Sequence, residues 1–273
     1  LGCLAALPTA HAQGVLKKIK ATRTIALGYS EAAAPFSFVG SDSRPQGYSI
    51  DLCTLVVEGL QERLGLAELK IKWVKVDVNT RMDAVLKGAV DLECGSTTHT
   101  LSREEKVDFS STILADGASL LSKTRNKVAA VKDLGGRRVA VIPGTTTEKA
   151  LQRALAQAGV TAQIVTVRAH PEGIAAVRED RADAYITDRA LLIGLLLGAL
   201  DVASYSLSDE MISFEPHALM MRREPDLRLA VNRELARIYG SGRIGDVYAR
   251  WYGAFGEPTA LTRALYFLNA YPD

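Results

Sequence analysis

Two segments near the start of the chain decide the fold class: residues 24–29 read TIALGY and residues 47–64 read GYSIDLCTLVVEGLQERL. The first is a short apolar run of the kind that forms a buried strand, and the second carries apolar residues at helical spacing. The residues between them contain Pro35-Phe36 and are typical of a loop. A strand, a loop and a helix in this order indicate an α/β fold.

The same alternation continues along the chain. Residues 70–76 read KIKWVKV, whose alternating pattern predicts a half-buried strand, and Asn79-Thr80 is the expected cap of a helix over 81–87. Further strands are predicted over 90–94, 138–142, 162–167, 184–187 and 217–221, and further helices over 146–158, 171–179, 188–197, 226–239 and 244–252. We therefore expect mainly parallel sheets flanked by helices, with ligands at the carboxyl ends of the strands.

The length of the chain favours two lobes, and its net charge does not indicate a macromolecular partner. The chain has 273 residues, more than a single core usually organises. Its formal net charge is +2, which favours neither nucleic acid nor an anionic membrane as a partner. The four histidines lack metal-ligand spacing, and the chain has no phosphate loop or dinucleotide fingerprint, so we expect no metal and no cofactor.

The N-terminal residues resemble a secretory signal. Residues 1–12 read LGCLAALPTAHA, which we interpret as the remnant of a signal peptide cleaved before Gln13, with a frayed helix as the alternative. Lipid attachment at Cys3 is a less favoured alternative. The predicted location is the periplasm, where Cys53 and Cys94 can form a disulfide if their geometry allows it, which the sequence leaves open.

One run carries a family resemblance. Residues 91–110 read DLECGSTTHTLSREEKVDFS, and the segments APFSF, GYSIDL, VIPGTTTEKAL, AYITDRALL and YARWYG accompany it along the chain. Together they resemble the family 3 extracellular solute-binding proteins, especially the glutamate/aspartate-binding members. The resemblance implies a type II periplasmic-binding-protein fold, in which two α/β lobes enclose an amino acid.

The resemblance also implies an organisation and a role. We expect lobe 1 to comprise residues 13–118 and 219–273, lobe 2 to comprise residues 119–218, and two strands to cross near 118–123 and 217–222. The implied role is that of a monomeric, non-enzymatic binding component of an ABC importer, which closes on glutamate or aspartate and delivers it to membrane permease subunits. Hinge closure needs contacts with both lobes.

A free amino acid requires a cation and donors for its carboxylate and an anion for its ammonium. Arg103 matches the family's carboxylate clamp, for which a guanidinium fork is suited, although a surface ion pair with Glu104 or Glu105 is the alternative. Asp188 matches the ammonium anchor, with a helix N-cap as the alternative. The remaining candidates are Ser96, Thr98, Thr145 and Thr146 as polar contacts, each alternatively a cap, and Phe36 as an apolar wall or core residue.

Specificity is the less determined part of the prediction. Arg81 matches a family arginine that faces the ligand's distal carboxylate, and His170 matches a second polar contact; a surface salt bridge and a loop position are their alternatives. Another family arginine falls at Ser30, so one expected cation is absent. A neutral ligand such as glutamine or asparagine therefore remains an alternative.

An enzyme on the same scaffold is the main competing prediction, because a fold does not determine function and some relatives are cyclohexadienyl or arogenate dehydratases. The sequence has no supported Ser-His-Asp or Cys-His arrangement. In this alternative, Glu31 or Asp188 carries out acid–base chemistry.

Overall fold

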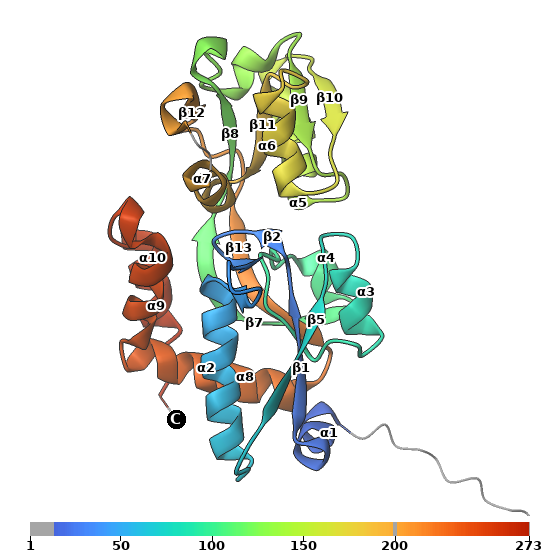
Figure 1. Cartoon of the computed structure of the whole chain (residues 1–273), viewed down its shortest axis with the longest axis vertical. Coiled ribbons are helices and arrows are strands. Elements are labelled where there is room, and N and C mark those ends of the chain that lie inside the picture. Colours follow the sequence, from blue (N-terminus) through green and yellow to red (C-terminus); the bar gives the residue numbers. More distant parts are fainter. Residues whose placement is uncertain (1–13, 199–200, 273) are drawn as a thin grey trace, which may run out of the picture.

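The protein consists of two α/β lobes, one above the other in Figure 1, joined by the strands β7 and β13. The computed structural model describes residues 14–198 and 201–272. The predicted signal remnant at residues 1–12, its cleavage point before Gln13 and the alternative lipid site Cys3 lie outside the described residues.

The first lobe contains a mixed five-stranded sheet in the order β5-β1-β6-β13-β7. Its strands are β1 (Thr24–Tyr29), β5 (Lys70–Lys75), β6 (Leu92–Glu93), β7 (Val107–Asp116) and β13 (Glu215–Arg222). The strands β5, β1 and β6 are parallel, whereas β13 runs antiparallel to both β6 and β7. Apolar residues that alternate on these strands face a large core shared with the helices.

Helices of the first lobe cover this sheet. They are α1 (Val15–Thr22), α2 (Tyr48–Arg63), α3 (Arg81–Leu86), α4 (Leu101–Glu104), α8 (Pro225–Gly240), α9 (Arg243–Tyr252) and α10 (Ala260–Leu268). A small sheet of β2 (Ala32–Ala33), β3 (Ser37–Val39) and β4 (Pro45–Gln46) forms the loop after β1. The last three helices return to the first lobe because their apolar faces pack on α2 and β7.

The second lobe repeats the pattern on a smaller scale. Its sheet has the order β10-β9-β11-β8-β12, formed by β8 (Ala118–Lys123), β9 (Arg138–Val141), β10 (Gln163–Thr166), β11 (Ala184–Asp188) and β12 (Tyr205–Leu207). Its helices are α5 (Thr146–Ala158), α6 (His170–Arg178) and α7 (Arg189–Leu197). Short 3-10 turns occupy 124–126, 131–134, 202–204 and, after α9, 253–255.

Both sheets are mixed rather than mainly parallel, which corrects the expected proportion of parallel pairing. In each lobe three strands pair in parallel, and two further strands at one side of the sheet, β13 and β7 in the first lobe and β8 and β12 in the second, add the antiparallel pairs. The reason is topological: a chain that leaves a lobe and later returns beside its own exit strand must run in the opposite direction.

The two crossings lie side by side. Asp116 at the end of β7 pairs with Glu215 at the start of β13, and the Ile212 amide donates to the Ala118 carbonyl at 2.8 Å. Between them, a Cβ on Gly117 would meet the Ser213 carbonyl oxygen at 2.2 Å, so the close approach requires glycine. The crossings therefore occur a few residues before the segments expected from the sequence.

One predicted cap is wrong. Thr80 precedes α3, but its side chain makes no hydrogen bond to the helix backbone; its hydroxyl instead accepts from the Asp77 amide and donates to the Asp77 carboxylate, both at 2.9 Å. The local Asp77 turn therefore competes successfully for the hydroxyl that the sequence pattern assigned to capping.

A disulfide settles the state of the two cysteines. Cys53 on α2 is bonded to Cys94, which directly follows β6, with the two Cα atoms 6.2 Å apart. Both residues are fully buried in the core of the first lobe. The disulfide fixes the segment that leads into Gly95-Ser96 to the main helix of that lobe.

In the described ranges, no helix is long and apolar enough to span a bilayer.

Candidate functional site

The candidate site lies where the two lobes touch, at the carboxyl ends of β6 and β11 and at the loop before α5. Thr98 of the first lobe and Thr146 of the second face each other with their hydroxyl oxygens 3.3 Å apart. The ends of parallel strands are where α/β sheets place ligand groups. The geometry thus brings residues from both lobes to one interface.

The Arg103 side chain is held in place by a backbone carbonyl of the first lobe. It lies in α4, and its Nη1 donates to the Thr98 carbonyl at 2.6 Å. Burial and the nearby charge of Arg81 lower the pKa of Arg103 to about 10, which leaves it cationic at neutral pH. No ion pair to Glu104 or Glu105 holds Arg103 among the described residues, where Glu104 pairs instead with His99 and Arg228.

The segment 96–99 is positioned by the returning strand. Thr98 forms a bridge with His217, the Ala218 amide donates to the Thr97 carbonyl at 3.2 Å, and the His99 amide donates to the Pro216 carbonyl at 2.7 Å. Ser96 is buried, and its hydroxyl makes no hydrogen bond within the described part of the chain. The backbone is therefore fixed while this hydroxyl stays available.

The two threonines of the second lobe differ. Thr145 caps α5: its hydroxyl accepts from the Glu148 amide at 3.1 Å and donates to the Ile142 carbonyl at 2.8 Å. Thr145 therefore caps α5, and its hydroxyl keeps one lone pair beyond these two hydrogen bonds. Within the described residues, the hydroxyl of Thr146 has a hydrogen-bond contact only with Thr98 across the interface, and it is the more available of the two.

Asp188 is a buried carboxylate without a full set of partners. It occupies the N-cap position of α7 at the end of β11 but makes no capping hydrogen bond, and its Oδ1 has no partner among the described residues. Burial raises the pKa of Asp188 well above its ordinary value, Glu215 and Asp116 raise it further, and Arg81 acts in the opposite direction. The carboxylate thus lacks the cation or donors that a buried charge requires.

Arg81 and His170 meet in a small cavity at the interface. Its lining also includes Ser30, Glu93 and Ser96. Arg81 is buried, with only 8% of its surface exposed, and no carboxylate of the described residues lies within the 4.0 Å ion-pair distance. The surface salt bridge considered for Arg81 is therefore absent there, and burial together with the charge of Arg81 lowers the pKa of His170 to about 4.

Ser30 and Phe36 contribute less directly. The Ser30 hydroxyl accepts from the Ala32 amide at 3.3 Å, so it serves the local turn as well as lining the cavity. Phe36 is fully buried and packs on Tyr48, Tyr252 and His217. It is a core residue that supports the site from behind His217.

Three buried polar side chains were missed by sequence reasoning. Glu93 ends β6 and accepts from the Thr97 hydroxyl at 2.7 Å, while Glu215 and His217 lie on β13 and each has a polar atom without a partner in the described residues. Burial and the charge of Arg81 lower the pKa of His217 to about 3, although the nearby Ser96 backbone acts in the opposite direction. The position of Glu93 at a predicted strand end was the one available signal.

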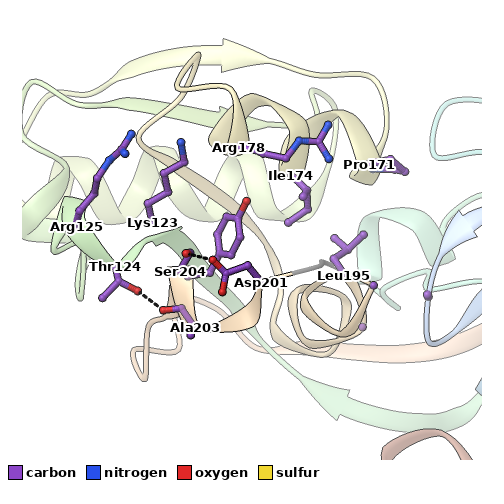
Figure 2. A pocket seen from close by; sticks show the side chains of 14 residues that line it. Lys123, Thr124, Arg125, Pro171, Ile174, Arg178, Leu195, Asp201, Ala203 and Ser204 are labelled. Carbon is purple, nitrogen blue, oxygen red and sulfur yellow. Dashed lines mark hydrogen bonds between the residues drawn. The ribbon is translucent and has the colours of Figure 1, made fainter.

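A larger cavity lies elsewhere, on the second lobe. Figure 2 shows its lining by Ile174 and Leu195, and its volume is about 1120 Å³. The neighbouring cations Lys123 and Arg125 are already paired with Asp180. None of the predicted site residues lines it, so size alone does not identify the site.

No cluster of three or more potential metal ligands occurs within 14–198 and 201–272.

The sequence of residues 25–254 matches the sequence model of the bacterial extracellular solute-binding proteins, family 3. The chain belongs to this family. The two lobes with their crossing strands are therefore the type II periplasmic-binding-protein fold, and the family places the protein outside the cytoplasmic membrane.

Two relatives and one solved structure are similar to this chain. It is 36% identical to the L-glutamate/L-aspartate-binding protein of Pseudomonas aeruginosa over 88% of this chain and 80% of the relative. It is 28% identical to the glutamate/aspartate import solute-binding protein of Salmonella typhimurium, with the same two coverages of 88% and 80%. It also resembles the ancestral amino acid-binding protein AncCDT-1, a precursor of cyclohexadienyl dehydratase, with a TM-score of 0.76 and 27% identity over 87% of this chain and 99% of the other.

Proposed function

We propose that this family 3 protein binds free L-glutamate or L-aspartate between its lobes and delivers it to the permease subunits of an ABC importer. The proposal includes a monomeric carrier without catalytic activity, secreted to the periplasm. Two relatives that share 80% of their length with this chain are named as glutamate/aspartate-binding proteins. The charges of the site support the same ligand class.

The observation that carries the proposal is the buried Asp188, which has an oxygen without a partner and no capping role. A ligand ammonium supplies the missing donors and charge. Arg103, already anchored to Thr98, presents its remaining guanidinium N–H groups to the ligand α-carboxylate, and Ser96 and Thr98 add hydroxyls. The roles of the two charged residues are thus opposite, as the zwitterion requires.

Acidic specificity rests on Arg81. It is the buried cation of the cavity shared with His170, and no carboxylate of the described residues forms an ion pair with it. A distal carboxylate on the ligand provides that partner, whereas a neutral amide leaves Arg81 with the longer-range attraction of Glu93 and no ion pair among the described residues. In this proposal Arg81 pairs with the distal carboxylate, which the uncharged Ser30 cannot do.

Lobe closure completes the proposed mechanism. We place the hinge at the two adjacent crossings, Asp116–Ala118 and Ser213–Glu215, close to the lobe boundaries expected at 118/119 and 218/219. Contacts with Asp188 and Thr146 in one lobe and Arg103 in the other stabilise the closed form, which the permease recognises.

Titration calorimetry on protein that has been unfolded, freed of ligand and refolded tests the proposal. We expect glutamate or aspartate to bind at least about tenfold more tightly than glutamine or asparagine, because an unpaired buried cation costs 1.4 kcal/mol or more. Arg81→Gln removes this preference, whereas Arg178→Gln, on the second-lobe surface, retains it. Binding of neutral amino acids alone contradicts acidic specificity, and turnover of prephenate or arogenate contradicts a carrier.

A further inference from the structure

A buried hydroxyl, that of Tyr185, lies next to His170, and Tyr185 is not among the residues that line the small cavity. The Nδ1 atom of His170 is 2.9 Å from the Tyr185 hydroxyl oxygen, and Tyr185 is completely buried. His170 belongs to α6 and Tyr185 to β11, so this contact ties the helix to the strand that ends in Asp188.

The Tyr185 ring occupies a space made for it. A Cβ built on Gly173, one turn after His170 in α6, would lie 2.4 Å from ring atoms of Tyr185. The ring therefore packs directly on the helix backbone, where a side chain larger than glycine does not fit. This packing fixes the phenol relative to the His170 ring independently of any hydrogen bond.

Thr187 is a further buried hydroxyl residue of β11. It lies two residues after Tyr185 and so on the same face of β11, and it is buried. Burial raises the pKa of the Tyr185 phenol, and the Thr187 side chain acts in the opposite direction. The one hydrogen bond of the Tyr185 hydroxyl within the described residues is that with His170 Nδ1, so the phenol proton, which a buried hydroxyl must donate, points toward this nitrogen.

The geometry points to Tyr185 as a positioning residue for ligand specificity: Tyr185 donates to His170 Nδ1, and His170 therefore presents Nε2–H to the ligand cavity. The inference rests on the proposed function. A neutral imidazole has one donor and one acceptor nitrogen, so an Nδ1 that accepts leaves Nε2 as the donor.

A donor at this position selects the ligand's distal group. His170 lines the same cavity as Arg81, and neither Arg81 nor an Nε2–H can accept a hydrogen bond. Both oxygens of a carboxylate can accept from this pair, whereas an amide can offer one oxygen and must turn its NH₂ group away. The relay through Tyr185 therefore reinforces the preference for glutamate and aspartate over their amides.

Tyr185→Phe tests the relay, because phenylalanine keeps the ring on Gly173 and removes only the hydroxyl. We expect glutamate affinity to fall about five- to tenfold and glutamine affinity to change less than about twofold, in keeping with the loss of one oriented hydrogen bond to a charged group. In a His170→Ala background the same substitution is expected to have no further effect. Equal weakening of both ligands, or an undiminished effect without His170, overturns the inference.

A measurement without ligand separates this inference from the proposed function. Nitrogen-15 chemical shifts of the histidine ring, assigned by comparison with His170→Ala, report the tautomer of His170 in ligand-free protein. We expect Nε2–H in the wild type and a mixture of tautomers in Tyr185→Phe. An Nδ1–H tautomer in the wild type refutes the relay whatever the protein binds, whereas an Nε2–H tautomer in a protein that fails to bind glutamate contradicts only the proposed function.

Discussion

The carboxylate oxygen Oδ2 of Asp188 lies 3.8 Å from Nε2 of His217, just too far for a hydrogen bond, and both side chains are buried. The contact spans the lobes, because Asp188 ends β11 of the second lobe and His217 lies on β13 in the sheet of the first. Each side chain retains polar atoms without a partner in the described ranges. Binding and stability therefore both depend on these two residues.

Removing the charge of Asp188 is expected to separate binding from stability. Its raised pKa means that the ionised form destabilises the ligand-free fold at pH 7, so Asp188→Asn is expected to unfold at equal or higher denaturant concentration. Glutamate affinity falls at least about 30-fold, because a charge partner of the ligand is lost. Calorimetry and urea titration measure the two effects. Asp83→Asn, on an exposed i,i+4 pair, is the control, and loss of stability in Asp188→Asn contradicts the argument.

Arg103→Lys tests the guanidinium geometry at constant charge. A lysine cannot both donate to the Thr98 carbonyl and grip a carboxylate with two parallel hydrogen bonds. We expect affinity for every amino-acid ligand to fall about 10- to 100-fold, corresponding to 1.5–3 kcal/mol for a charged hydrogen bond. Arg178→Lys serves as the matched control in the calorimetric titration. Unchanged affinity in Arg103→Lys removes this residue from the site.

The disulfide is expected to be a major stabilising element. Cys53 and Cys94 are 41 residues apart in sequence, and cross-linking a loop of that size restricts the unfolded chain by about 2–4 kcal/mol. The variant carrying Cys53→Ala and Cys94→Ala should lose this amount of unfolding free energy in a urea titration. Reduction of the wild type by dithiothreitol should reproduce the loss, and a reduced wild type of full stability contradicts it.

The buried histidines predict a fall in stability on acidification. The pKa of His217 is lowered from 6.5 to about 3, so below pH 6.5 the unfolded chain takes up a proton that the folded protein does not. Stability attributable to His217 is therefore present above pH 6.5 and is lost toward pH 3 by about 1 kcal/mol per pH unit. His217→Gln should show a shallower slope between pH 6 and 4 in denaturant titrations. His170, whose pKa is lowered to about 4, maintains part of the slope in the variant; identical slopes contradict the assignment.

Local signals made the helices predictable. The range expected for α5, residues 146–158, agrees with the structure because a threonine cap and a C-terminal Gly159 with positive φ define both ends locally. The resemblance to family 3 selected Arg81, Arg103 and Asp188, whose roles in the site stay predictions. By contrast, the burial of Glu215 and His217 arises from pairing of β13 with β7, about a hundred residues earlier in the chain. No local pattern encodes such a contact.

The bond between Cys53 and Cys94 has a consequence for the thermodynamics of recognition. It anchors the chain two residues before Ser96 and four before Thr98, and the bridge from Thr98 to His217 anchors the other end. The conformational entropy of this segment is thus lost when the protein folds, before any amino acid arrives. In the proposed carrier, the first lobe acts as a rigid template, and ligand binding has to order only the approach of the second.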